Sequence, residues 1–303
     1  MRRGLPLLLL LVGCKPDLGN PPSLIVDERV IAVRLDPPEV TPGAQVAAEV
    51  VAVGPQGRLP LSADVKWDLC VAPKPPAENN VVSKACLTGA GLQPAGTGPT
   101  VMVTVPLTAC SLHGPDTPPT KAGEPPIRPR DPDVTGGYYQ PLSITLPSGE
   151  RAFALERVGC NLPSVSLEVA QDFAHRYKAN ANPVLASLSA DGAPVDPATP
   201  LVVSAGRNVT FEAAWTPASH EPFPVYDVAR REIVDHREEL VVSWFTTAGA
   251  FTRERTGHTE SDDSTTVSNE WTAPAAPGAV TVWLVQRDNR GGASLAEDQL
   301  MVP

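Results

Sequence analysis

Apolar and polar residues alternate along two stretches of this chain, and each stretch is interrupted by a glycine turn. Residues 29–35 and 46–50 flank Thr41-Pro42-Gly43, and residues 183–188 and 209–213 flank Ser204-Ala205-Gly206. A period of two residues is typical of strands that bury one face, and the turn residues separate successive strands. The pattern therefore predicts antiparallel β-structure in both halves.

The two halves repeat one another. When they are aligned on the glycines, TPGAQVAAEV faces SAGRNVTFEA, and a strand with one central tryptophan follows in each half, Trp67 and then Trp244. A tryptophan on the third strand resembles the core of immunoglobulin-like sandwiches. Residues 269–292, which end in an Asp-x-x-Gly-Gly turn, resemble the last hairpin of bacterial Ig-like or PKD-like domains. We expect an all-β protein of two tandem Ig-like β-sandwiches, residues 25–163 and 183–303, joined by a short α-helix.

The joining helix is predicted within residues 164–182. Ser164 or Ser166 can cap it, and an apolar stripe at helical spacing follows, made of Leu167, Val169, Ala170, Phe173, Ala174 and Tyr177. Pro183 disfavours helix at the residue before it. The sequence leaves open whether this helix docks on a sandwich or is a loose linker.

Two insertions enlarge the sandwiches. Residues 111–136 are rich in proline and poor in large apolar side chains, which predicts an exposed loop. Residues 224–227 and 232–236 predict a hairpin around Ala229-Arg230, which we expect to extend the sheet that carries Trp244.

The N-terminus has the layout of a secretory signal peptide. Arg2 and Arg3 precede the apolar run Leu5 to Val12, which is too short to span a bilayer. The run ends in Leu-Val-Gly-Cys14, which resembles a bacterial lipobox; the alternative is an ordinary signal peptide with a chance cysteine. The resemblance implies removal of residues 1–13, acylation of Cys14 and a lipidated tether over residues 14–24. Lys15 after the cysteine favours the outer membrane, facing the periplasm or the cell surface.

Four further cysteines, Cys70, Cys86, Cys110 and Cys160, all precede residue 161. An even number of cysteines in an exported chain predicts two disulfides, and four cysteines allow three pairings. The short, proline-rich first loop favours Cys70–Cys86 with Cys110–Cys160. A zinc site is disfavoured, because no CxxC or CxH pair occurs.

Composition and net charge limit the folds and the partners that this chain can have. The 35 prolines and 23 glycines exclude long helices, since proline removes a backbone donor and clashes inside a helix. The formal charge of −10, with no basic stripe, argues against a nucleic-acid partner. The membrane, reached through the lipid, and a protein of the envelope are the expected partners.

Motifs for chemistry are scarce. The five histidines are scattered, and a triad of Ser243, His258 and Asp262 has no support from spacing. Glu260, Asp262, Asp263 and Asp288 could offer oxygen ligands to calcium, although arginines stand among them. Tyr138 and Tyr139 could stack on a sugar. We therefore expect no catalytic residue, no metal and no cofactor. The predicted function is a non-enzymatic binding or structural role at the cell envelope, with a carbohydrate- or calcium-binding module as the alternative.

Overall fold

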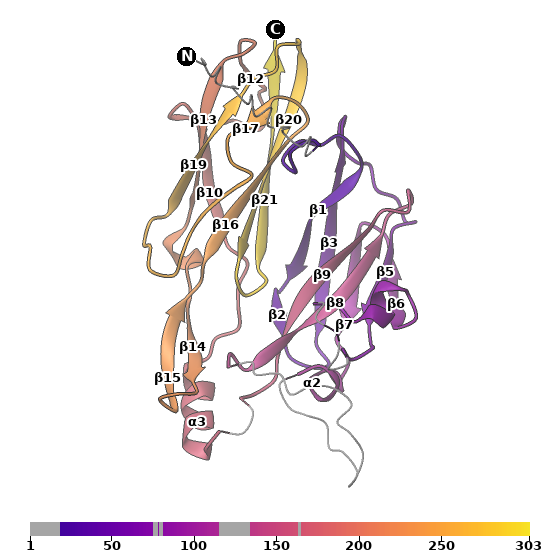
Figure 1. Cartoon of the computed structure of the whole chain (residues 1–303), viewed down its shortest axis with the longest axis vertical. Helices are drawn as coiled ribbons and strands as arrows, with labels where there is room; N and C mark the ends of the chain where they lie inside the picture. Colours follow the sequence, from indigo (N-terminus) through magenta and orange to yellow (C-terminus); the bar gives the residue numbers. More distant parts are fainter. Residues whose placement is uncertain (1–18, 75–77, 79–80, 115–133, 163–164) are drawn as a thin grey trace, which may run out of the picture.

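The protein consists of two β-sandwiches that lie side by side (Figure 1). The computed structural model describes residues 19–74, 78, 81–114, 134–162 and 165–303. The all-β class and the sandwich architecture expected from the alternating pattern are confirmed. Cys14, the predicted signal peptide and most of the proline-rich loop lie outside the described residues.

The first sandwich has two sheets. One contains β1 (Arg29–Asp36), β3 (Gln45–Gly54), β4 (Gly57–Arg58) and β7 (Thr100–Thr104), with β3 paired to the other three. The other has the order β2 (Glu39–Val40), β9 (Arg151–Gly159), β8 (Gly137–Thr145), β5 (Lys66–Cys70) and β6 (Leu92–Thr97).

The second sandwich also has two sheets. One has the order β11 (Ala193–Pro194), β10 (Leu185–Ala190), β13 (Asn208–Trp215), β19 (Thr266–Thr272) and β17 (Ala250–Phe251). The other has the order β12 (Leu201–Val202), β21 (Ala293–Val302), β20 (Gly278–Asp288), β16 (Leu240–Thr246) and β18 (Arg255–His258).

The two sandwiches share the topology of their main strands, as the repeated sequence pattern indicates, although their short edge strands differ. In each sandwich, the first long strand pairs antiparallel with the second long strand, β1 with β3 and β10 with β13. Between these two long strands in the sequence, a short strand crosses to the opposite sheet. There β2 pairs in parallel with β9, and β12 pairs in parallel with β21. The sheets β2-β9-β8-β5-β6 and β12-β21-β20-β16-β18 correspond strand by strand.

Each predicted tryptophan is buried on the strand where the sequence places it. Trp67 of β5 donates its indole N–H to the Gly98 carbonyl at 2.7 Å, and Trp244 of β16 donates to the Thr256 hydroxyl at 2.9 Å. A buried tryptophan usually satisfies its indole N–H in this way. Both rings lie in the cores between the two sheets of their sandwiches.

The structure forms the disulfides Cys70–Cys86 and Cys110–Cys160, the pairing that the sequence favoured. The first joins the end of β5 to the one-turn helix α1 (Lys84–Leu87). The second joins the one-turn helix α2 (Ala109–Leu112) to the residue after β9. Neither short helix was predicted, because four residues are too few to show a helical period.

The joining helix α3 is shorter than the predicted segment and spans Leu167–Arg176. Ser166 caps it by accepting a hydrogen bond from the Val169 N–H at 3.3 Å, as one of the two predicted caps. Tyr177, which the apolar stripe places in the helix, is extended instead, and its hydroxyl donates a hydrogen bond to Glu39. Within the described part of the chain, no helix is both long and apolar enough to cross a membrane.

The predicted hairpin forms, but it does not extend the sheet of Trp244. Strands β14 (Pro222–Asp227) and β15 (Glu232–Arg237) pair only with each other and make a separate two-stranded sheet. The hairpin packs beside α3 instead (Figure 1), where Arg176 bridges Asp172 and Asp235. This contact also docks the helix, so it is not a loose linker. The short helix η1 (Pro217–Ser219) precedes the hairpin.

A second apolar layer joins the two sandwiches, and strand β21 runs beside β1 there (Figure 1). Ile31, Val51 and Val53 point out of the first sandwich and pack against Trp283 and Val285 of the second. Strands β3 and β20 are thus buried on both faces, which explains the unbroken apolar runs at residues 50–53 and 282–285.

The end of the expected tether also belongs to this joint. Residues 14–18 lie outside the described residues, but Ile25 is 1% exposed within the joint. The Ile25 N–H donates to the Thr246 carbonyl, and the Thr246 N–H donates to the Ser23 carbonyl, both at 2.8 Å. Residues 23–25 are therefore docked on the second sandwich and are not a free spacer, because burial of Ile25 stabilises the docked chain.

Candidate functional site

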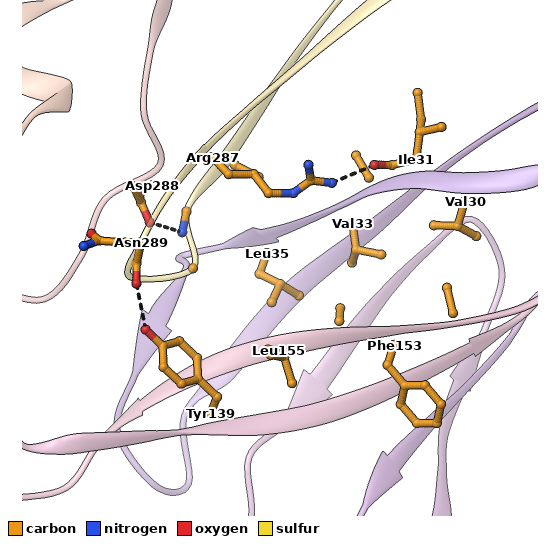
Figure 2. A pocket seen from close by; sticks show the side chains of 16 residues that line it. Val30, Ile31, Val33, Leu35, Tyr139, Phe153, Leu155, Arg287, Asp288 and Asn289 are labelled. Carbon is orange, nitrogen blue, oxygen red and sulfur yellow. Dashed lines mark hydrogen bonds between the residues drawn. The ribbon is translucent and has the colours of Figure 1, made fainter. Parts of the chain in front are cut away.

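The candidate site is a cleft of about 440 Å³ at the junction of the two sandwiches (Figure 2). Figure 2 shows Val30, Val33 and Leu35 of β1 along one side and Tyr139, Phe153 and Leu155 of β8 and β9 along the other. The end of β20 and its turn to β21 close one end, where Asp288 and Asn289 lie, and Arg287 of β20 reaches from there to the Ile31 carbonyl. The side walls are mostly apolar, and the charged groups gather at the turn.

The edges of strands β1 and β9 border this cleft, and they differ in whether their backbone groups are already hydrogen-bonded. The β1 edge is covered by side chains, because Arg287 donates to the Ile31 carbonyl at 2.7 Å and Asn182 donates to the Leu35 carbonyl at 2.8 Å. Strand β9 pairs with β2 at Arg157 and Val158 only. Within the described chain, residues 151–156 of β9 therefore have strand β8 on one side and no strand on the side that faces the cleft.

The turn at the end of the cleft explains the Asp-x-x-Gly-Gly sequence. One carboxylate oxygen of Asp288 accepts the N–H groups of Arg290 and Gly292, both at 2.8 Å. Gly291 has a φ of 108°, which favours glycine, and a Cβ at Gly292 would meet the Asp288 carboxylate at 2.2 Å. The sequence thus folds this turn back over Tyr139, whose hydroxyl donates to the Asn289 carbonyl at 3.1 Å (Figure 2).

Behind the turn, a buried network of charges joins the two sandwiches. Glu39 of β2 is 2% exposed and lies 2.8 Å from the Arg290 guanidinium of the second sandwich. It also lies 3.3 Å from Arg157 of β9 and accepts the Asn180 N–H at 2.7 Å. A carboxylate buried among several donors is held firmly, since each donor offsets part of its lost hydration.

On the side of the second sandwich, Arg290 is the centre of this network. Besides Glu39, its guanidinium reaches Glu238 at 3.2 Å and donates to the Tyr177 hydroxyl at 3.1 Å and the Lys178 carbonyl at 2.9 Å. Its charge also lies over the rings of Tyr177 and Phe223. One arginine thus connects the first sandwich, the segment after α3 and the β14–β15 hairpin.

Two buried carboxyl groups near the network have raised pKa values. Burial, and then the charge of Asp288, raises the pKa of Glu238 to about 8, against the opposing effect of Arg290. Burial, and then the charge of Glu39, raises the pKa of Glu156 to about 8. Neither carboxylate oxygen of Glu156 has a hydrogen-bond partner among the described residues. These surroundings favour the protonated form of Glu156 near neutral pH, whereas the contact with Arg290 favours the charged form of Glu238.

The network and the apolar joint make the cleft a preformed feature. Its walls belong to both sandwiches, and these are fixed to one another by buried contacts on either side of the β20–β21 turn. Chemically, the cleft offers apolar side chains and an unpaired strand edge. In other proteins, groups of this kind accept an extended segment by strand addition.

The structure separates the tyrosine pair that could have stacked on a sugar. Tyr138 is 4% exposed within the core of the first sandwich and stacks on His113, whereas Tyr139 faces the cleft below Arg157. Adjacent residues of a strand point to opposite faces. The two rings therefore cannot form one platform.

The candidate calcium ligands are not brought together. Glu260 pairs with His236, Asp263 pairs with Arg237, and Asp262 pairs with His258, while Asp288 is buried in the turn of the cleft. Hydrogen bonds from Ser264, and then His258, lower the pKa of Asp262 to about 2. In the described ranges, no group of three or more acidic, histidine or cysteine residues is placed to hold a metal ion.

The Ser243, His258 and Asp262 combination does not form a triad. His258 lies opposite Leu240 in the β16–β18 register, and its ring packs on Trp215 of the sandwich core. Ser243 lies opposite Arg255 and points to the other face of the sheet. The cysteines form the two disulfides described above, and Cys14 lies outside the described residues.

Comparisons with known proteins add little to the site. No protein-family model matches the sequence, and no curated protein matches it either. Among solved structures, the chain resembles the D00-D0 domain of Intimin at 9% identity and a TM-score of 0.23, with 90% of this chain and 100% of that chain covered. A likeness at this level carries no conclusion about the activity or partners of this chain.

Sequence reasoning missed the buried network. Glu39, Arg157 and Arg290 stand in ordinary polar surroundings in the sequence, and no spacing connects residues 39, 157 and 290. The apolar runs at 50–53 and 282–285 were the available signal, because strands buried on both faces require a second partner layer.

Proposed function

We propose that this chain is a lipid-anchored, non-enzymatic protein of the bacterial outer membrane that holds a partner protein of the envelope. The partner would add an extended segment along the free edge of β9, with its apolar side chains between β1 and β9. Strand addition of this kind draws affinity from backbone hydrogen bonds and specificity from side-chain pockets. The unpaired edge at residues 151–156, beside the apolar wall of β1, carries this proposal.

The fixed joint supports a binding role. A cleft whose walls come from two domains keeps its shape only if the domains do not move, and preorganisation reduces the entropy lost on binding. The Glu39–Arg290 contact and the packing of Trp283 against Val51 and Val53 provide that rigidity. The two disulfides suit an oxidising compartment, which agrees with export.

The partner site is tested by placing a photoreactive residue at Ala152, on the cleft wall, and at Met102, an exposed residue of β7 on the same sandwich. In intact cells, the first position should cross-link to one envelope protein, and the second should not. With that protein purified, the amides of residues 151–156 should gain protection from hydrogen exchange. Equal cross-linking at both positions, or protection at β7 and not at β9, would contradict the proposal.

The anchor is tested separately. Changing Cys14→Ala removes the sulfur that would carry the lipid, so the variant should leave the membrane fraction without detergent. Continued dependence on detergent would contradict the anchor and would leave the cleft proposal to stand on the cross-linking result.

A further inference from the structure

Two arginines stand on the outer face of the second sandwich, where it meets the first. In the β18–β16–β20 register, Arg255 lies opposite Ser243 and Arg287 lies opposite Val241. Ser243 and Val241 are two residues apart on one strand, so they share a face. Arg255 and Arg287 therefore flank the same short stretch of β16 from its two sides.

A third arginine reaches this place from the first sandwich. Arg29, at the start of β1, lies with its guanidinium carbon 5.3 Å from the centre of the Phe245 ring, which is on the same face of β16 as Ser243. The three arginines, Ser243 and Phe245 line one cavity of about 420 Å³. It adjoins the cleft, and Figure 2 shows Arg287 at the shared wall, donating to the Ile31 carbonyl.

These arginines lack the counter-ions that others in the chain have. Eight arginines of the described chain have a carboxylate within 4 Å, namely Arg34, Arg58, Arg157, Arg176, Arg207, Arg230, Arg237 and Arg290. In the same described ranges, no carboxylate lies that close to Arg29, Arg255 or Arg287. This gathering of positive charge occurs in a chain with a formal charge of −10.

Three positive charges close together without counter-ions are electrostatically unfavourable. Burial lowers the pKa of Arg29, and burial together with the charge of Arg255 lowers the pKa of Arg287. The Nε atom of Arg29 is buried without an acceptor among the described residues. Arginine remains protonated in proteins, so these groups cannot relieve the repulsion by losing a proton. A bound anion would supply both the missing charge and the missing acceptor.

We propose that Arg29, Arg255 and Arg287 form a binding site for a phosphate group in the cavity that they line between the two sandwiches. Guanidinium groups bind the oxygens of carboxylates and phosphates with paired hydrogen bonds. Three guanidinium groups and the Ser243 hydroxyl present more donors than the two oxygens of a carboxylate can accept. A tetrahedral anion offers more oxygens, in several directions, and a phosphate can carry two charges.

The phosphate can come from free phosphate or from a phospholipid headgroup. Both present the same oxygens to the arginines, but the headgroup is a diester with a single charge. Residues 19–28 lie between this site and Cys14 in the sequence, so the headgroup as source rests on the proposed anchor. The site is independent of strand addition at β9, and either proposal can fail without the other.

The test is calorimetric titration of the full chain at constant ionic strength with two probes, inorganic phosphate and glycerophosphoglycerol, the soluble headgroup of phosphatidylglycerol. We expect one site per chain. Tighter binding of inorganic phosphate identifies free phosphate as the ligand, and tighter binding of the diester identifies the lipid headgroup. Arg255→Gln should weaken binding of the preferred probe about tenfold or more, since an arginine–phosphate contact is a strong charged hydrogen bond. Arg255→Lys should recover part of that loss.

The matched control is Arg253→Gln, which removes the same charge from an exposed arginine two residues away that does not line the cavity. This variant should bind phosphate within about twofold of the unchanged protein, because Arg253 does not line the cavity and salt screens a charge that makes no direct contact with the anion. Arg255 is exposed, so its replacement leaves the fold intact, which circular dichroism verifies. Absence of saturable binding by both probes, equal effects of the two variants, or equally tight binding of glutarate would each overturn the phosphate site.

Discussion

The two sandwiches share a strand order but differ in what holds them together. The core of the first is built mainly from small aliphatic residues such as Val46, Ala48 and Val50 around Trp67, and two disulfides brace its ends. The core of the second has no disulfide and packs three tryptophans, Trp215, Trp244 and Trp271, with Phe211 and Phe251. The same topology is thus stabilised by covalent links in one half and by aromatic packing in the other.

This difference shows how one fold tolerates two kinds of core. A large aromatic ring buries far more apolar area than valine or alanine, so the second core gains more hydrophobic stabilisation per residue. The first core gains less in this way, and its disulfides compensate by restricting the unfolded chain. The joint between them follows neither scheme, because it combines an apolar layer with a buried ion network.

Loss of an aromatic ring should have the largest effect, and it should fall on the second sandwich. Trp271 is fully buried against Phe211, and its indole N–H donates to the Ala248 carbonyl at 3.2 Å. Trp271→Ala should lower the free energy of unfolding by about 3–5 kcal/mol, because it removes a large buried ring and leaves a cavity. Urea unfolding measures this loss. A cost no larger than that of Met301→Ala, at a partly exposed residue of the same sandwich, would show that the aromatic core is not decisive.

A substitution in the buried ion network between the sandwiches should lower the free energy of unfolding nearly as much as one in the core. Glu39→Gln removes the negative charge between Arg157 and Arg290 and leaves both buried guanidinium groups undercompensated, with a cost of about 3 kcal/mol. Hydrogen exchange should rise at β1 and β21, where the sandwiches meet. Glu49→Gln, which breaks the exposed pair with Arg58, is the control and should cost less than about 1 kcal/mol. Similar costs for the two variants would mean that the buried network does not hold the joint.

The two disulfides of the first sandwich should differ in strength. Removing a crosslink restores loop entropy to the unfolded chain, and the Cys110–Cys160 bridge closes a separation of 50 residues against 16 for Cys70–Cys86. The double Cys→Ala variant of the longer bridge should lose about 1 kcal/mol more. Hydrogen exchange should rise in the first sandwich and stay constant in β13 and β19. The opposite order would indicate that strain or local packing outweighs chain entropy.

The last expected effect is a dependence on pH that originates at Glu156, whose side chain lies on the same, core-facing side of β9 as Ala154 and Val158. The folded-state pKa of Glu156 is about 8, above the ordinary value of 4.5, so the folded state binds this proton more tightly than the unfolded chain. Stability should therefore fall as the pH rises from about 5 to about 8. Glu156→Gln should match the unchanged protein near pH 4 and exceed its unfolding free energy by up to about 4 kcal/mol at pH 8, because each unit of pKa shift corresponds to about 1.4 kcal/mol. Unfolding measured at both pH values tests this, and a variant that is less stable at pH 8 would contradict it.

Local sequence patterns predicted the parts that depend on neighbouring residues. Period-two alternation located the strands around Trp67 and Trp244, Ser166 was one of the two expected helix caps, and the short loop favoured the Cys70–Cys86 pairing. The hairpin of β14 and β15 was also predicted, but its position was not, because a hairpin pattern says nothing about which surface its outer face covers.

The sequence by itself determined the fold class, the duplication and the β20–β21 turn, since side-chain periodicity and the needs of Gly291 act within a few residues. Only the tertiary structure decided how the two sandwiches of the chain pack against each other. Glu39 and Arg290 are separated by 251 residues, and their attraction becomes strong only when folding removes the water between them. The cleft and the arginine cluster exist for the same reason: both are made by surfaces that meet only after each sandwich has folded.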